Sequence, residues 1–300
     1  MKTGVMPVGH LSASQVRSVL LAATAPPPLR NARPWRFQCT PETIELYADP
    51  LTTGTDSEQR ERLLDCGAAL LNLRLAIKAQ GSHADVRLFP SAGRPDLLAV
   101  VRPEGYETIA PHDGELVAAI ADRQSNRRPF TSAVVPAVVQ RQLRRAAEVE
   151  RAWLATITPE QVPQLREIMR RTEVPPAAPG PGGGTDLDVE PERLVVVIGT
   201  LHDTVLARVQ AGQALQRVLL TATAAGISAA LTTQPMAVPA IRRELRQLLG
   251  GGLWPQIMLR LGHGTAVAPS SRPQLEDVVI SDEHPFAASR PDDGARRGSR

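Results

Sequence analysis

The sequence predicts an α+β fold, an α/β sandwich, in which one chain contains an internal duplication. Short segments with the β-branched or alternating pattern of strands occur between longer segments whose apolar residues recur at helical spacing. The two longest predicted helices share identical residues at matching positions, and the elements around them follow in the same order. With 300 residues and 42% hydrophobic content, the chain can bury at least one large core.

The first half, assigned to residues 1–110, is predicted to contain two helices and four strands. The helices are expected at residues 12–24 and 57–80, the first ending at a proline triplet and the second at Gly81. One apolar stripe of the longer helix consists of Leu63, Cys66, Leu70, Leu73 and Ile77. The strands are expected at residues 35–39, 43–48, 86–89 and 97–102.

The second half, assigned to residues 111–283, is predicted to contain five helices and four strands. The helices are expected at residues 114–123, 136–149, 159–171, 205–225 and 238–249. The strands are expected at residues 153–157, 194–199, 227–231 and 256–261. Proline and glycine dominate residues 174–192, which we interpret as a mobile connector, and residues 284–300 have the composition of a disordered tail.

Identical residues at a constant separation indicate the duplication. In the two longest helices, six pairs lie 145 positions apart: Gly67 and Gly212, Ala69 and Ala214, Leu70 and Leu215, Leu75 and Leu220, Ala79 and Ala224, and Gly81 and Gly226. The helices before them share three pairs 123 positions apart: Val16 and Val139, Leu20 and Leu143, and Ala23 and Ala146. Chance similarity between alanine- and leucine-rich helices is the alternative, but the matching order of elements favours duplication.

Composition indicates which classes of function the protein is not expected to have. The formal net charge is only +3, and the basic residues are almost all arginine, so we expect no nucleic-acid partner. The sequence has no signal peptide and no apolar run long enough to cross a bilayer, so a soluble protein without a membrane partner is expected. Cys39 and Cys66 do not form a disulfide framework, which favours a reducing cytoplasm. The six histidines have no metal-binding spacing.

Three segments carry more specific information. The first, residues 27–37, reads Pro-Pro-Leu-Arg-Asn-Ala-Arg-Pro-Trp-Arg-Phe. The second, residues 123–130, reads Arg-Gln-Ser-Asn-Arg-Arg-Pro-Phe. The third is Ser-Arg-Pro at residues 271–273, followed by Leu-Glu-Asp-Val at residues 275–278.

These segments resemble the motifs of flavin-dependent nitroreductases, in particular the fused Acg-type subgroup of actinobacteria. The first is similar to the family's Pro-Ser-x-x-Asn-x-Gln-Pro-Trp segment, and in the subgroup this segment ends in Pro-Trp-Arg-Phe. The second resembles the Arg-Arg-Ser-x-Arg-x-Phe segment, and the third resembles the C-terminal arginine and closing strand. The resemblance extends from about residue 16 to residue 279. It implies a nitroreductase-like FMN-binding fold.

The resemblance also implies how the cofactor is shared. In the ordinary homodimer, one subunit supplies the two arginine segments to the FMN phosphate, and the other supplies the asparagine segment beside the flavin ring. Here the first half has only the asparagine segment and the second half has only the arginine segments, so one chain should build one site. The implied cofactor-binding residues are Pro27, Leu29, Arg30, Asn31, Arg33, Arg123, Ser125, Arg127, Arg128, Thr232, Thr233, Gln234 and Arg272.

Each group of candidates has a physical role and a structural alternative. The arginines near residue 125 and Arg272 could make charge-assisted contacts with a phosphate dianion, or they could form a solvated basic turn at a helix end. Asn31 could contact the flavin edge or the ribityl hydroxyls, or form an Asx-turn. Residues 232–234 match the family loop beside the reactive flavin nitrogen, or form a plain strand-to-helix connection. Trp35 is expected to be a core residue.

The sequence also departs from the family pattern. Pro28 replaces the usual serine, Arg30 the subgroup's histidine, Arg33 the glutamine before Pro-Trp, and Gln124 the second arginine of its segment. The proline removes a backbone N–H, and the arginines add positive charge near the ring. The helical segment that covers the flavin in the subgroup is also missing, because only the proline–glycine connector lies between residues 171 and 194.

The leading hypothesis is therefore an FMN-dependent oxidoreductase that passes hydride from NAD(P)H through the flavin to a nitro, quinone or similar acceptor. No catalytic side chain is required, and a monomer suffices because the chain is a pseudo-dimer. The second hypothesis is a flavin-binding protein without turnover, motivated by the departures. The third is a scaffold without flavin, whose arginines bind another anion or a partner.

Overall fold

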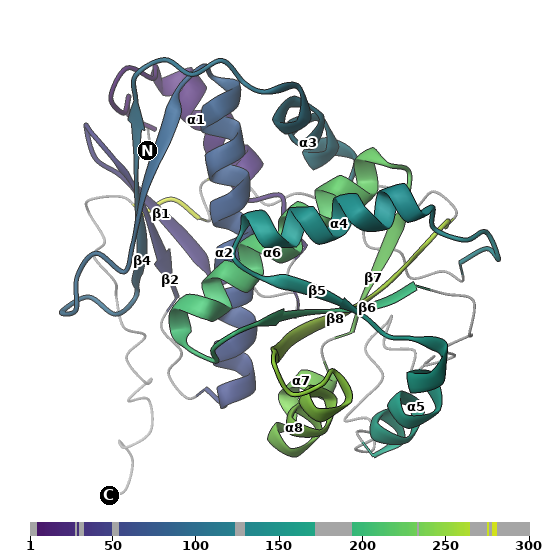
Figure 1. Ribbon diagram of the computed structural model, residues 1–300. Coiled ribbons are helices and arrows are strands. Elements are labelled where there is room, and N and C mark those ends of the chain that lie inside the picture. The colour runs from purple at the N-terminus through teal and green to yellow at the C-terminus, as the bar shows by residue number, and fades with distance from the viewer. Residues whose placement is uncertain are drawn as a thin grey trace, which may run out of the picture.

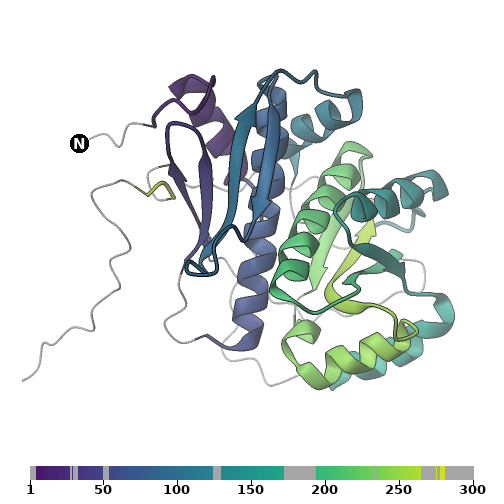
Figure 2. The same ribbon diagram turned by 60° about the vertical axis from the view of Figure 1, so that its left-hand side comes forward.

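The computed structural model describes residues 5–27, 29, 33–49, 54–123, 130–171, 194–232, 234–264, 275 and 278–280. Two four-stranded antiparallel sheets lie on either side of two long crossed helices, α2 and α6 (Figure 1). Turned by 60°, the molecule shows α2 standing between the two sheets (Figure 2). The predicted α+β class is confirmed.

The first unit contains one sheet and two helices. Its elements are α1 (Ala13–Ala23), β1 (Trp35–Cys39), β2 (Ile44–Ala48), α2 (Asp56–Ala79), β3 (His83–Leu88) and β4 (Leu97–Glu104). The strands follow the order β1-β2-β4-β3. The predicted apolar stripe of α2 is buried in one core with α1 and the sheet. Both helices begin with a capping box, from Ser12 and Gln15 in α1 and from Thr55 and Glu58 in α2.

The second unit repeats this arrangement and adds helices to it. The repeated elements are α4 (Ala137–Val149), β5 (Trp153–Thr156), β6 (Leu194–Thr200), α6 (Val205–Ala224), β7 (Ser228–Thr232) and β8 (Trp254–Gly262). The added ones are the 3-10 turn η1 (Pro159–Gln161), α5 (Val162–Arg170), α7 (Gln234–Ala237) and α8 (Pro239–Leu248). Helix α3 (Pro111–Asp122) connects the two units. Figure 1 shows α5, α7 and α8 on the face of this sheet opposite to α4 and α6.

The two sheets have the same internal plan. The strand order β5-β6-β8-β7 matches β1-β2-β4-β3 element by element. The register between β2 and β4 shifts at Leu46/Tyr47, and the register between β6 and β8 shifts at Ile198/Gly199, which is the corresponding place. The repeat found in the sequence therefore coincides with a repeat of topology, while the boundaries at residues 110 and 283 stay a prediction.

The helices α2 and α6 approach each other most closely at two glycines. A Cβ atom on Gly67 would lie 2.2 Å from the carbonyl oxygen of Val209, and one on Gly212 would lie 2.1 Å from that of Leu64. Gly67 and Gly212 are 145 positions apart, and so are Leu64 and Val209. The crossing is therefore symmetric, and only glycine fits at its centre.

Two predicted elements differ from the structure. The helix predicted at residues 159–171 begins as the separate turn η1 before α5, where Thr158 and Gln161 form a capping box. The four-residue helix α7 was not predicted, because one turn is too short to show apolar periodicity. The predicted connector at residues 174–192 and the tail at residues 284–300 lie outside the described residues.

The end of the described chain returns from the second unit to the first. The backbone N–H of Phe37 in β1 donates to the carbonyl of Val278 at 2.8 Å, and the N–H of Ile280 donates to the carbonyl of Phe37 at 2.8 Å. Leu275 and Val278 are buried in the core of the first unit. The closing segment, residues 278–280, thus pairs in parallel with β1 and connects the two units.

Candidate functional site

The start of the arginine segment, residues 123–130, lies next to the chain just before the asparagine segment, residues 27–37. Arg123 follows the last residue of α3, and its Nη2 donates to the carbonyl oxygen of Ala25 at 3.4 Å. Ala22 and Ala25, at the end of α1, pack against the apolar cluster that joins α2, α3 and α6. Two segments almost one hundred residues apart in the sequence therefore meet at the ends of α1 and α3.

The other end of the arginine segment is also fixed. Phe130 is buried and pairs with Gly264, just beyond β8. A Cβ atom on Gly262 would lie 3.1 Å from the Phe130 ring, so glycine at this position gives the ring its space. The candidates between these anchors, Ser125, Arg127 and Arg128, lie outside the described residues, as does Arg272.

The asparagine segment is anchored through Leu29. Its backbone N–H donates to both carboxylate oxygens of Asp65 on α2, at 3.1 and 3.3 Å. Its side chain packs against the core of the second unit, to which Leu64 and Leu231 also belong. Leu29 therefore lies between the first unit's central helix and the second unit's core. The candidates Arg30 and Asn31 lie outside the described residues, as does Pro28.

The remainder of this segment is held by β1 and its neighbours. Trp35 is fully buried, as predicted for a core residue. The side chain of Arg36 donates to the carbonyl of Arg33 at 3.0 Å and forms an ion pair with Asp49 at 2.7 Å. Cys66 Sγ lies 3.7 Å from the carbonyl of Pro34, and burial raises the pKa of this thiol well above its usual value.

The third group of candidates lies at the end of β7. Thr232 is the last residue of this strand and Gln234 is the first residue of α7, with Thr233 outside the described residues. Leu231, one residue earlier, belongs to the same core as Leu29. The end of β7 and the asparagine segment thus share one apolar cluster.

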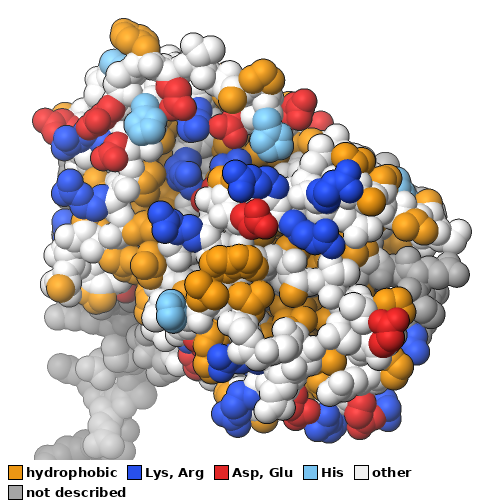
Figure 3. Space-filling view, in the orientation of Figure 1, with side chains coloured by type: hydrophobic (Ala, Val, Ile, Leu, Met, Phe, Trp, Pro, Cys, Tyr) orange, Lys and Arg blue, Asp and Glu red, His pale blue; other side chains and the backbone are white. Residues whose placement is uncertain are grey.

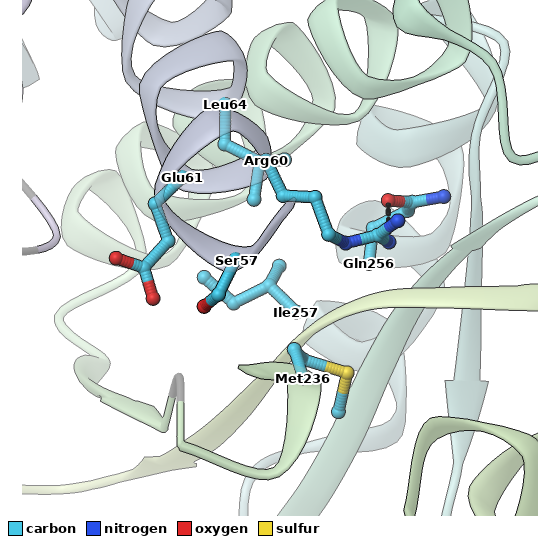
Figure 4. Close-up of a pocket in the computed structure, with 7 residues that line it drawn as sticks. All are labelled: Ser57, Arg60, Glu61, Leu64, Met236, Gln256 and Ile257. Carbon is cyan, nitrogen blue, oxygen red and sulfur yellow. Dashed lines mark hydrogen bonds between the residues drawn. The ribbon is translucent and has the colours of Figure 1, made fainter. Parts of the chain in front are cut away.

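A small pocket lies between α2 and α7. Its empty volume is about 240 Å³, part of which is open solvent. The lining residues are Ser57, Arg60, Glu61, Leu64, Met236, Gln256 and Ile257. Leu64 connects this pocket to the cluster that holds Leu29. Figure 4 shows that the side chain of Arg60 extends away from Glu61 and toward Gln256.

The polar wall of the pocket links the two units. Arg60 is only 2% exposed and donates to both oxygens of Asp203 at 2.6 and 2.8 Å, and to Gln256 at 2.7 Å. Burial lowers the pKa of Arg60, although Asp203 opposes this shift. Burial would raise the pKa of Asp203, but Arg60 and Arg208 bring it below its usual value. This network fixes α2 of the first unit on β8 of the second.

Asp65 and Glu61 form a buried acidic pair one turn apart on α2. Asp65 is 4% exposed and Glu61 is 7% exposed. Burial raises the pKa of Asp65 well above its usual value, the hydrogen bond from Leu29 opposes this shift, and the charge of Glu61 adds to it. Sequence analysis missed both acids, since neither belongs to a family motif.

The equivalent place in the second unit is built differently. Residues 24–34 connect α1 to β1, whereas only residues 150–152 connect α4 to β5. Asn72 of α2 donates to the carbonyl of Ala22 near the end of α1, and Arg217, 145 positions later, donates to Glu150 at the end of α4 at 2.8 Å. Glu150 is buried and also accepts from Arg74 at 2.7 Å.

Further ion pairs surround Glu150. Arg217 also pairs with Asp113 of α3 at 3.3 Å, and Lys78 pairs with Asp113 at 3.1 Å. Figure 3 shows basic and acidic side chains next to each other on the face of the molecule that α2, α3, α4 and α6 present. Ion pairs thus occupy the end of α4. The equivalent place in the first unit, the end of α1, leads into the long connection at residues 24–34.

Comparison with known proteins decides the family. No family model matches the chain. In Mycobacterium tuberculosis strain H37Rv, a protein provisionally named NAD(P)H nitroreductase is 32% identical over 319 residues, with 89% of this chain and 91% of that protein covered. The chain belongs to the nitroreductase family. A second relative from this strain, provisionally named NAD(P)H nitroreductase acg, is 25% identical and covers 86% of the chain.

Solved structures of nitroreductases align with about half of this family member. A nitroreductase with bound FMN from Bacteroides fragilis is 16% identical and covers 56% of this chain and 99% of its own, with a TM-score of 0.44. A structure from Desulfovibrio desulfuricans, described as a nitroreductase in complex with FMN, is 20% identical and covers 60% and 99%, with a TM-score of 0.42.

The described residues show neither a metal-binding cluster nor a membrane-spanning helix. Within the described part of this nitroreductase-family chain, no three His, Cys, Asp or Glu side chains are grouped so that they could hold a metal ion. None of the described helices combines the length and the apolar character needed to span a membrane.

Proposed function

We propose that this chain is an FMN-dependent oxidoreductase that uses NAD(P)H to reduce a nitro, quinone or similar acceptor. The observation that carries the proposal is the hydrogen bond from Arg123, the first residue of the arginine segment, to the carbonyl of Ala25, two residues before the asparagine segment. The relatives named as NAD(P)H nitroreductases support the same proposal.

The residue types of the two segments suit an FMN molecule. Arginine side chains make charge-assisted, often bidentate contacts with phosphate, and the segment that begins at Arg123 contains Arg127 and Arg128. We assign the phosphate to this segment, with Ser125 and Arg272. We assign the flavin ring to residues 27–33, with Pro27, Leu29, Arg30, Asn31 and Arg33, and to residues 232–234, with Thr232, Thr233 and Gln234.

The chain's own groups have binding and orienting roles in this proposal. Bound FMN would supply the redox chemistry by accepting a hydride from NAD(P)H and passing it to the acceptor. The arginines hold the phosphate end, while the Leu29 anchor positions the segment at the ring. No side chain is needed as a general acid or base.

One complete site per chain is also part of the proposal. The asparagine segment has no counterpart in the second unit, where residues 150–152 form a short turn and Glu150 is engaged by Arg74 and Arg217. A single chain then acts as the family's dimer does, which makes a monomer sufficient.

A flavin-binding protein without turnover is the second candidate. Pro28 lacks the backbone N–H that a serine would offer, and Arg30 and Arg33 add charge next to the ring. Such a protein would bind FMN but would not be bleached rapidly by NAD(P)H.

An absorbance spectrum of the purified protein, before and after addition of FMN and then NADPH or NADH, tests these candidates. We expect micromolar or tighter FMN binding and anaerobic bleaching of the flavin band. The double change Arg123→Ala and Arg127→Ala should weaken FMN binding at least tenfold, because two charge-assisted contacts are lost. Arg145→Ala is the matched control, because this arginine is 77% exposed on α4.

Each outcome separates the candidates. Binding without bleaching by either nucleotide selects the flavin-binding protein without turnover. A protein that binds no FMN at all contradicts both candidates. Equal loss of affinity in the double variant and in the Arg145 control would contradict the assigned phosphate site.

A further inference from the structure

We infer that Asp65 is a positioning residue of the flavin site, acting on the cofactor through the backbone of Leu29. The inference rests on the proposed function and deepens it, because Asp65 lies on α2 and belongs to none of the three motif segments. It names a residue that holds the ring-side segment in place without touching the ligand itself.

Among the described residues, Asp65 holds the backbone of Leu29. Both of its oxygens lie within hydrogen-bond distance of the Leu29 N–H, at 3.1 and 3.3 Å. The Leu29 side chain packs against the second unit's core at the same time. A single residue of the segment is thus held by a hydrogen bond on one side and apolar packing on the other.

The broken symmetry of the two units supports a functional reason for this acid. The position equivalent to Asp65 on α6 is Gln210, which is 145 positions later and half-buried. The second unit has only residues 150–152 where the first unit has the anchored segment. The acidic residue is therefore found in the first unit, which contains the anchored asparagine segment.

Stability alone does not account for an acid at this position. A buried carboxylate is costly to desolvate, and Glu61 one turn away adds repulsion when both are charged. The surrounding positions of α2, Leu64 and Cys66, are apolar and buried. An apolar residue would pack there at lower cost, so the hydrogen bond to Leu29 is what the acid provides.

The experiment compares two changes at this position with a change at its symmetric equivalent. Asp65→Leu removes the acceptor and keeps the number of side-chain heavy atoms, Asp65→Asn keeps an acceptor oxygen, and Gln210→Leu is the matched control. FMN affinity is measured by quenching of flavin fluorescence, and the environment of bound flavin by visible circular dichroism. Hydrogen exchange of the Leu29 amide in the protein without FMN reports the anchor directly.

We expect Asp65→Leu to weaken FMN binding about tenfold to a hundredfold, the range for leaving a buried N–H without its acceptor. It should also change the flavin dichroism and speed exchange of the Leu29 amide. Asp65→Asn should stay within about threefold of the parent protein, and Gln210→Leu should leave all three readouts unchanged.

Three results would overturn the inference. If the parent protein binds FMN and Asp65→Leu binds it equally well, the inference fails and the proposed function stands. If Asp65→Leu merely lowers the melting temperature without altering affinity or dichroism, Asp65 is structural only. If the parent protein binds no FMN, the proposed function fails and the inference fails with it, even where Leu29 exchange responds as expected.

Discussion

Asp65 shows at the scale of one residue how burial and position determine chemistry. The ordinary pKa of this carboxyl group is 3.8, and burial raises its pKa well above that value in the folded protein. A group whose pKa rises on folding stabilises the folded state at acid pH, and this contribution is lost as the pH rises through the folded pKa. Near neutral pH the carboxylate therefore reduces the free energy of unfolding.

Replacing Asp65 by asparagine should remove this pH dependence. We expect the free energy of unfolding of Asp65→Asn, relative to the parent protein, to increase from about pH 4, near the ordinary pKa, toward neutral pH. Denaturant titrations of both proteins in the absence of FMN, at several pH values in this range, measure the difference. A constant difference across the range would show that Asp65 does not titrate with a raised pKa in the folded protein.

At the scale of elements, the close crossing of α2 and α6 is the main constraint on the sequence. The paired glycines let the two backbones touch, and long apolar stripes bury both helices on either side of that point. The helices end alike as well, with Gly81 at φ +78° and Gly226 at φ +70°.

A methyl group at the crossing should separate the helices. We expect Gly67→Ala to lower the free energy of unfolding by about 1–3 kcal/mol or more, because its Cβ would lie 2.2 Å from a backbone oxygen that cannot rotate away. Gly114→Ala in α3 is the control, since a Cβ there meets nothing within 4 Å and alanine favours a helix. Both are measured by denaturant unfolding. Equal stability of the two variants would contradict the described crossing.

At the scale of the whole molecule, two similar units form one asymmetric protein. The first unit supplies the asparagine segment, the second supplies the arginine segment, and the closing segment returns to β1. The other end of the pair, near Glu150, Arg74 and Arg217, is closed by buried ion pairs. A buried charge that lost its partner there would be strongly destabilising, which disfavours a second ligand at that end.

The proposed stoichiometry follows from this asymmetry. We expect one FMN per chain in a titration followed by fluorescence, with a monomer's mass in light scattering at the same concentration. An endpoint of two FMN per chain would show that the second unit also forms a site. An endpoint of one FMN per two chains would show that the site needs a second copy.

Sequence reasoning predicted most of the fold, because local signals determine most of its elements. Capping residues, proline and glycine limits, and apolar spacing placed the described helices and strands within a few residues, and the duplication predicted the shared strand order. Helix α7 was missed because a single turn lacks periodicity.

The site was less predictable, because its supporting contacts join distant residues. Arg60 meets Asp203 only after the two units have packed, and Leu29 meets Asp65 only after the first unit has folded. In the sequence, Arg60 and Asp65 look like the solvated face of a helix. The family motifs indicated which segments matter, whereas folding decides which buried acids and arginines support them.

The joining of two similar units in one chain has a consequence for how such a protein can change over time. Where two separate identical chains meet, every mutation occurs twice, once on each side of the axis, and dilution can pull the partners apart. In a covalently joined pair, a mutation alters one side only, and the two sides stay together at any concentration. One unit of such a pair can therefore differ from the other, as the short, ion-paired connection at residues 150–152 differs from the longer connection at residues 24–34.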